Sequence, residues 1–134
     1  MKADPSKLRT AALFGFLAVA LGAMGAHGLR NSWEAEKGIV EAAKLLEVWK
    51  TASLYHVVHA VVLLILAYVF SDRTQGRWVF ASFVWGTILF SGSLYGLCAF
   101  GFRWLGPVTP IGGLLLMLGW LLLVVRTGTK TKPV

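Results

Sequence analysis

Four long uncharged runs, separated by short segments that carry the charged residues, set the hydrophobic pattern of this chain. The runs cover residues 10–29, 51–71, 78–102 and 107–125. A helix rises about 1.5 Å per residue, so the second run reaches about 30 Å, which is the thickness of a bilayer's hydrocarbon core. The pattern predicts four transmembrane helices. We expect the first run to be a span as well, because it is longer than the apolar core of a usual signal peptide.

The segment between the first two runs has a different, amphipathic pattern. Asn31 followed by Glu34 resembles a capping box at the start of a helix. Apolar side chains then share one helical face, opposite the charged ones. The apolar face consists of Ile39, Ala42, Ala43, Leu46 and Trp49. We expect an amphipathic helix over residues 32–50 on the membrane surface, with a packing helix on the aqueous side as the alternative.

The composition points to the same class of protein. Hydrophobic residues make up 57% of the chain and charged residues only 14%, far from the profile of a soluble domain. The length fits one domain over residues 1–134, and no linker rich in charge, Pro or Ser divides it. The expected fold is an all-α membrane protein, with four transmembrane helices in a compact bundle plus the amphipathic surface helix.

The basic side chains flank the apolar runs. The formal net charge is +7, but its spread over termini and connections fits the edges of a membrane better than nucleic acid. The termini and the second connection carry Lys2, Lys7, Arg9, Arg73, Arg77, Arg126, Lys130 and Lys132. The first and third connections carry Arg30, Lys37, Lys44, Lys50 and Arg103. This bias predicts that both termini are cytoplasmic or, in an organelle, on the equivalent inner side.

Polar side chains gather in one half of the bilayer. Because successive spans alternate in direction, the ends of the first and third and the starts of the second and fourth lie at one level. The residues placed there include His27, His56, His59, Ser91, Ser93, Tyr95 and Thr109. The candidate ligand-binding residues are His27, His59, Tyr95, Thr109 and Ser91.

Metal or haem binding is one hypothesis for this level. His56 and His59 are three residues apart and share a helical face, which is compatible with one metal ion, and His27 adds a third imidazole. Two histidines from different helices could instead hold a haem. No Asp, Glu or Cys is expected at the same depth, so we interpret the histidines as structural and assign no metal and no cofactor.

The pattern of reactive residues argues against an enzyme. Ser91, Ser93 and Cys98 lack a base that a carboxylate could orient. The four runs contain no Asp, Glu, Lys or Arg, whereas proton-coupled carriers usually need an ionisable pair inside the membrane. We therefore expect neither an enzyme nor a transporter.

Four sequence stretches occur in an order similar to that of a known family. They are GAMGAHGL (22–29), TASLYHVVHA (51–60), FSGSLYGL (90–97) and TPIGG followed by LGW (109–113 and 118–120). Together they resemble the domain of unknown function 423 family. This family includes bacterial inner-membrane proteins and a mitochondrial one. The resemblance implies a four-helix membrane protein with both termini on one side, for which we expect the bacterial inner membrane, and it brings no catalytic residue, cofactor or substrate. His27 and His59 match histidines of the family, whereas His56 stands where many members have Gln.

Two functions follow from these patterns. The first is a non-enzymatic accessory or scaffold subunit in the lipid bilayer, packed in a larger membrane complex or a homo-oligomer. It is favoured by Ala18, Gly22 and Ala26, whose spacing lets a neighbouring helix approach closely. The alternative is a binder of a lipid-like, quinone-like or metal or haem ligand in the polar pocket. In that pocket we expect His59 to matter most and His56 to be an ordinary membrane-interface residue.

Overall fold

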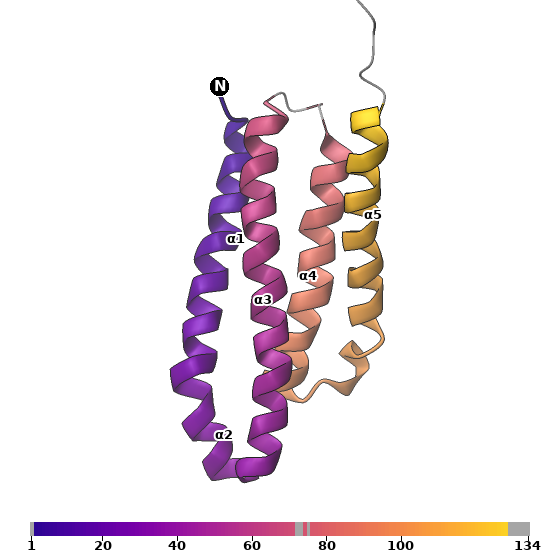
Figure 1. Cartoon of the computed structure of the whole chain (residues 1–134). Coiled ribbons are helices and arrows are strands. Elements are labelled where there is room, and N and C mark those ends of the chain that lie inside the picture. The colour runs from indigo at the N-terminus through magenta and orange to yellow at the C-terminus, as the bar shows by residue number, and fades with distance from the viewer. Residues whose placement is uncertain (1, 72–73, 75, 129–134) are drawn as a thin grey trace, which may run out of the picture.

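The computed structural model describes residues 2–71, 74 and 76–128, and the secondary structure among them is helical throughout (Figure 1). The elements are α1 (Pro5–Ala23), η1 (Met24–Leu29), α2 (Arg30–Lys37), α3 (Ile39–Val69), α4 (Arg77–Phe100), η2 (Arg103–Leu105) and α5 (Val108–Gly128). The segment η1 is a π-helix and η2 is a 3-10 helix. Since α1, η1 and α2 follow one another without a break, they form one continuous rod.

Among the described residues, four helical stretches are long and apolar enough to cross a membrane. They are Pro5–Lys37, Ile39–Val69, Arg77–Phe100 and Arg103–Arg126. The prediction of an all-α membrane protein with four spanning helices is therefore confirmed. The start of α1 and the end of α5 lie at the same end of the molecule (Figure 1). Arg73, Lys130 and Lys132, which contribute to the predicted charge bias, lie outside the described residues.

The segment 32–50 does not form one separate surface helix, which corrects the sequence-based prediction. The first rod continues to Lys37, the chain reverses at Gly38, and α3 then runs without interruption to Val69. Gly38 has a φ of 80°, a left-handed conformation that glycine adopts without steric cost. The apolar face expected on the membrane is instead buried between the two rods. It comprises Ala42, Leu46 and Trp49, with Trp33 from α2.

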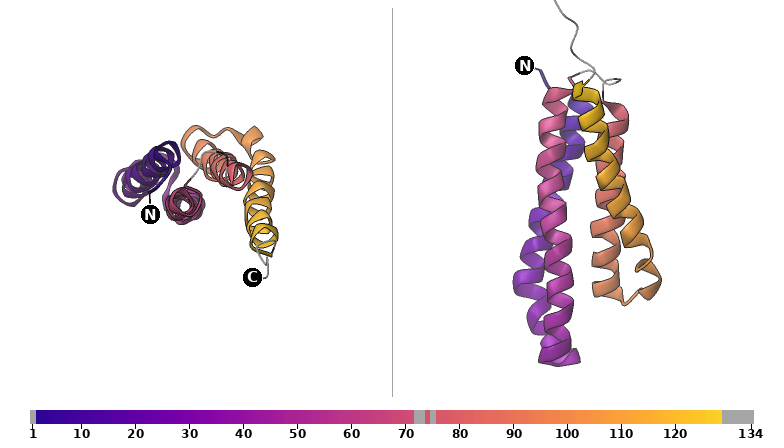
Figure 2. Two further views of the ribbon diagram at one scale, coloured as in Figure 1. Left: turned by 90° about the horizontal axis from the view of Figure 1, so that it is seen from above. Right: turned by 45° about the vertical axis from the view of Figure 1, so that its right-hand side comes forward.

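The ends of these two rods form a helical hairpin that extends beyond α4 and α5 (Figure 2). With 31 residues, α3 is about 46 Å long, well beyond the hydrocarbon thickness of about 30 Å. The outward side of the hairpin carries exposed ion pairs, Lys44 with Glu41 at 3.4 Å and Lys50 with Glu47 at 2.7 Å. The hairpin is therefore the part of the molecule suited to water, at the end opposite the start of α1.

The helices pack side by side in the order α1, α3, α4, α5, as Figure 2 shows from above. The central helices α3 and α4 each have a neighbour on both sides, whereas α1 and α5 occupy the ends of the row. In the most apolar part of α3, 39% of the residues are buried inside the protein. The corresponding share is only 17% in the first span and in the last. The bundle is therefore an open row with two edge helices.

Glycines let α4 and α5 approach each other closely. Gly86 of α4 lies against Leu116, and Gly112 of α5 lies against the backbone of Phe90. A Cβ at Gly112 would overlap with that backbone. Small residues of this kind are enriched where membrane helices meet. The TPIGG motif therefore forms the contact between these two helices.

Candidate functional site

The motif GAMGAHGL forms the end of α1 and the π-helix η1, and Trp49 of α3 packs into this region. The indole N–H of Trp49 donates a hydrogen bond to the backbone oxygen of Leu21, 2.9 Å away. A side chain that inserts into the backbone hydrogen-bond ladder is a known cause of irregular helix geometry. Gly25 lies directly against the indole, where a Cβ would overlap with the ring. The motif thus supplies a glycine surface and a backbone acceptor for one tryptophan.

Trp49 belongs to a buried cluster of aromatic and polar side chains that joins α1, α3 and α4. Its ring packs on Tyr95 of α4, with the ring centroids 4.6 Å apart. The Tyr95 hydroxyl donates to Oγ of Ser53 at 3.3 Å and lies 3.5 Å from Nδ1 of His56. The His56 ring meets Phe14 of α1 at 5.7 Å, edge to face. One hydroxyl of α4 is thereby linked to two polar side chains of α3.

His59 lies one turn further along α3, in a different environment. Its Nδ1 is 2.8 Å from the backbone oxygen of Tyr55, and its ring lies between those of Tyr55 and Phe83. A carbonyl oxygen only accepts, so Nδ1 carries the proton and Nε2 of the neutral ring is an acceptor. Both Nε2 of His59 and Oγ of Ser91 on α4 are buried without a hydrogen-bond partner among the described residues.

Thr109 connects α5 to α4. Its Oγ1 is 2.7 Å from Oγ of Ser93, which also bonds to the backbone oxygen of Phe90 at 2.9 Å. A hydrogen bond between membrane helices contributes about 0.6 to 2 kcal/mol. The contacts of Thr109 therefore fasten α5, and they do not include the other predicted site residues.

His27 is exposed on η1, away from the buried side chains of α3. His56 faces Phe14 and Tyr95, whereas His59 faces Tyr55 and Phe83, so the two rings of α3 have different neighbours. In the part of the chain that the structure describes, no three His, Cys, Asp or Glu side chains gather as a metal site would require. The arrangement gives no support to a three-imidazole site.

A cavity of about 240 Å³ opens beside the Trp49 cluster. Its floor is the glycine-rich surface of Gly22, Gly25 and Ala26. Trp49 and Ser53 form one wall, and Arg30 and Lys50 stand at its rim. This volume is below the roughly 300 Å³ at which pockets for drug-sized ligands begin. The cavity therefore suits a small polar group better than a whole quinone or haem.

Sequence reasoning missed the centre of this arrangement. The hydrophobic pattern places Trp49 on a membrane-facing side and His56 at the membrane interface, whereas the structure buries both. The available signal was the spacing of Trp49, Ser53 and His56, which puts all three on one face of a continuous helix. Of the predicted residues, the structure brings only Tyr95 into this cluster.

Comparison with known proteins agrees with the architecture. A family model described as "Protein of unknown function (DUF423)" matches residues 21–113. A UPF0382 membrane protein of Staphylococcus saprophyticus is 39% identical over 117 residues, covering 87% of this chain and 91% of the relative. The UPF0382 membrane protein YwdK of Bacillus subtilis is 39% identical over 118 residues, covering 85% and 89%.

A relative also occurs in a eukaryote. A UPF0382 membrane protein of Schizosaccharomyces pombe is 38% identical over 120 residues, covering 86% of this chain and 95% of the relative. No solved structure matches the chain. The family match, the identity to these membrane proteins and the four spanning helices agree, and the chain belongs to the DUF423 family of membrane proteins.

Proposed function

We propose that the chain is a non-enzymatic accessory subunit that associates through one side of α1 with a second copy of itself. This side, called the small flank below, consists of Ala12, Gly15, Val19, Gly22 and Ala26. The observation that carries the proposal concerns its glycines. Within the described residues, a Cβ at Gly15 or Gly22 would have no neighbour within 4 Å. The small flank is therefore open along the middle of an edge helix.

Both edge helices expose large apolar side chains, such as Leu13 and Phe16 of α1, but among the described residues α5 has no exposed run of small residues beside them. The exposed side of α5 carries large aliphatic side chains: Leu114, Met117, Leu118, Leu121, Val124 and Val125. Large aliphatic residues suit lipid tails, whereas interfaces between membrane helices are enriched in small residues that allow close approach. This contrast favours α1 over α5 as the helix that receives a second copy.

Bulky substitution tests the small flank. Gly15→Leu fills the open side of α1, and Gly92→Leu is the matched control, because Gly92 is exposed on α4 and has equally open surroundings among the described residues. Size measurement by light scattering after purification in mild detergent should show an oligomer for the native chain and Gly92→Leu, and a monomer for Gly15→Leu. A native chain recovered as a lone monomer would overturn the proposal. A different co-purifying membrane protein would replace the second copy as the partner.

We also propose that the protein lies in a bacterial inner membrane with both termini in the cytoplasm. Support comes from the cluster of Lys2, Lys7, Arg9 and Arg77 at the end where α1 begins, since Lys and Arg are enriched on the cytoplasmic side. A reporter that is active only outside the cytoplasm, fused at Val134, should be inactive. An active reporter would reverse the orientation.

Binding of a small polar ligand in the polar half of the bundle is the second candidate function. It is favoured by Nε2 of His59, a buried acceptor without a partner among the described residues, because such an atom is costly to leave unbonded. Mass spectrometry of small molecules that co-purify with the protein should detect a ligand that His59→Ala loses. The control is His27→Ala, which changes an exposed histidine of η1 and should retain the ligand. Equal recovery from both variants would remove this candidate.

A further inference from the structure

A second hollow, of about 310 Å³, lies between the first turns of α1 and the first turns of α4. It is called the α1–α4 groove below. Seen from above, α3 lies to one side of the line that joins α1 and α4, which leaves the opposite side less filled by helices (Figure 2). The groove lies at the end of the molecule where α1 begins, far from the hairpin and from the Trp49 cluster.

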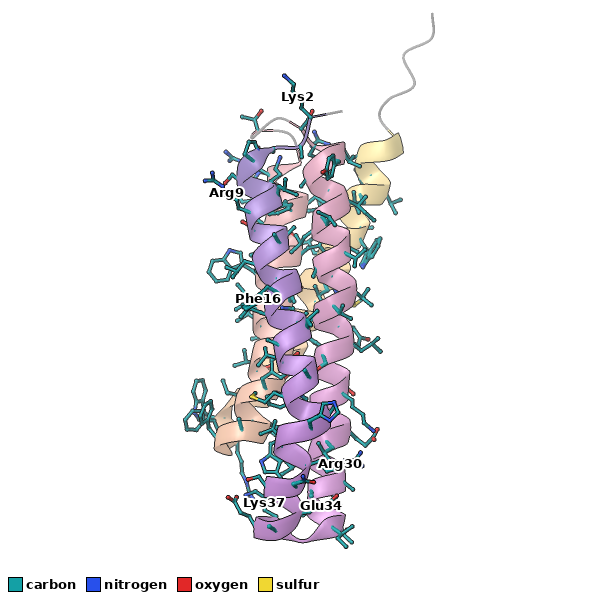
Figure 3. The ribbon with its side chains drawn as sticks, turned by 90° about the vertical axis from the view of Figure 1, so that its left-hand side faces the viewer. Lys2, Arg9, Phe16, Arg30, Glu34 and Lys37 are labelled. Atoms are coloured by element: carbon teal, nitrogen blue, oxygen red, sulfur yellow. The ribbon has the colours of Figure 1, made fainter. Side chains whose placement is uncertain are left out.

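The mouth of the groove is polar and cationic. Asp4, Ser6, Lys7 and Thr10 line it at the start of α1, and Arg77 lines it from the first residue of α4. The Asp4 carboxylate is buried, accepts from the backbone N–H groups of Ser6 and Lys7, and is paired with the Lys7 ammonium group. Arg9 lines an adjoining hollow that shares Ser6 and Thr10 with the groove. Figure 3 shows Arg9 and Lys2 at this end of the molecule, opposite Arg30 and the hairpin. Two arginines from different helices thus stand beside the same pair of hydroxyl-bearing residues.

The two arginines, and not Lys7, supply the available charge. Lys7 is buried, donates to the backbone oxygen of Phe70 at 2.8 Å and forms an ion pair with Asp4 at 3.8 Å. Arg77 is exposed, and its guanidinium group lies 4.7 Å from the ring of Trp78. Stacking on an aromatic ring leaves the guanidinium N–H donors directed outward in the ring plane. An anion at the mouth would therefore meet an accessible guanidinium group.

The body of the groove is apolar and runs toward the middle of the membrane. Phe80, Ala81, Val84 and Trp85 form its wall on α4. The distance along the helix from Arg77 to Trp85 is about 12 Å, at about 1.5 Å per residue step. The wall is therefore long enough to accompany the upper part of a lipid acyl chain, below a cationic mouth at the level of the head groups.

Trp85 is an unusual residue for its depth. Its side chain is 58% exposed, although tryptophans of membrane proteins prefer the head-group level, where the indole N–H finds polar partners. Trp78, two turns earlier, occupies that usual level. An apolar chain lying in the groove would cover the flat face of Trp85, which explains a large aromatic surface at this position.

We propose that the α1–α4 groove binds an anionic glycerophospholipid from the leaflet on the side of the termini. The phosphate lies at Arg77, within reach of the hydroxyl of Ser6 and the charge of Arg9, and one acyl chain lies along Ala81, Val84 and Trp85. Clusters of basic side chains next to membrane helices are a recognised basis for selecting anionic head groups. The groove and the small flank lie on opposite sides of α1, so this inference does not depend on the proposed self-association.

Charge removal tests the mouth of the groove. The full chain in detergent is mixed with equal amounts of phosphatidylglycerol and phosphatidylcholine, and bound lipid is counted by native mass spectrometry. The native chain should retain phosphatidylglycerol preferentially, and Arg77→Gln should lower this retention about fivefold, the effect of one basic residue near a charged lipid surface. Lys2→Gln removes one charge from the same end of the molecule without touching the groove, and it should change little. Equal losses from both variants, or equal retention of both lipids, would overturn the proposal.

A second experiment tests the body of the groove and separates a lipid from a free phosphate. Ala81→Trp fills the apolar wall without changing any charge, so it should displace phosphatidylglycerol while the protein stays folded by circular dichroism. Phosphatidylglycerol with brominated acyl chains should quench the tryptophan fluorescence of the native chain more than that of the Trp85→Phe variant, because bromine quenches only nearby indoles. Retention of the lipid by Ala81→Trp would overturn the acyl-chain assignment. Binding of inorganic phosphate that competes fully with the lipid would reduce the site to an anion site and refute the lipid as occupant.

Discussion

Replacement of Gly25 by alanine tests how Trp49 is held on η1. The added methyl group would overlap with the indole ring, which is 2% exposed and hydrogen-bonded to Leu21. Displacement of the ring away from Gly25 would strain or break that hydrogen bond. Gly28 provides the matched control in the same π-helix, because the nearest atom to its Cβ would be the flexible Met24 side chain at 3.9 Å.

The two substitutions should change stability in opposite directions. Overpacking of a well-packed site costs about 1–3 kcal/mol, and the broken indole hydrogen bond adds about 1 kcal/mol. Alanine in place of glycine inside a helix contributes about 0.5–1 kcal/mol in the other direction. Gly25→Ala should therefore lower the free energy of unfolding by about 1–3 kcal/mol. Gly28→Ala should raise it by up to about 1 kcal/mol, because no clash opposes the gain.

Reversible unfolding in mixed micelles, with an increasing fraction of sodium dodecyl sulfate, measures both free energies by far-ultraviolet circular dichroism. The near-ultraviolet signal of the tryptophans should also change in Gly25→Ala and stay native in Gly28→Ala, since only the first variant displaces Trp49. Equal stability of the two variants would refute the close packing of Trp49 on Gly25. So would a stabilised Gly25→Ala.

Two further pairs of substitutions can be compared in the same unfolding assay. Trp49→Phe should cost about 1 kcal/mol more than Trp33→Phe, because both indoles are buried but only that of Trp49 has a hydrogen bond among the described residues; equal losses would contradict the role of that bond. Gly112→Ala should lower the free energy of unfolding by about 1–3 kcal/mol, because its methyl group would meet the rigid backbone at Phe90. Gly92→Ala should raise it by up to about 1 kcal/mol, because Gly92 lies in α4 with open surroundings among the described residues; equal effects would contradict the close approach of α4 and α5.

The four spans could be predicted from the sequence because hydrophobic length and the bilayer thickness fix them almost independently of packing. The depth of the polar residues in the bilayer could be predicted in the same way, from their positions along the spans. Depth alone, however, does not say which way a side chain points, since each residue turns the helix by about 100°. This is why His27 and His59, expected in one pocket, lie respectively on an exposed surface and between Tyr55 and Phe83.

The error over residues 32–50 has a related cause. An amphipathic pattern shows that one side of a helix is apolar, but it does not show what covers that side. Here the covering surface is the neighbouring rod, with Trp33 packed on Trp49 at 5.9 Å between ring centroids. The break at Gly38 was readable from the sequence as a helix stop signal, and it would have divided the segment correctly.

Hydrogen bonds fasten the edge helix α1 to α3 at both of its ends, on either side of the apolar contacts of Ala11 and Phe14. Between helices in lipid there is little hydrophobic driving force, so polar contacts and close packing must hold an edge helix in place. At one end the backbone N–H of Asp4 donates to the backbone oxygen of Ala67 at 3.0 Å, and Lys7 donates to that of Phe70, directly after α3, at 2.8 Å. At the other end Trp49 bonds to Leu21. A helix fastened at both ends keeps its register while both of its flanks stay exposed, which is the condition that a lipid on one flank and a second helix on the other both require.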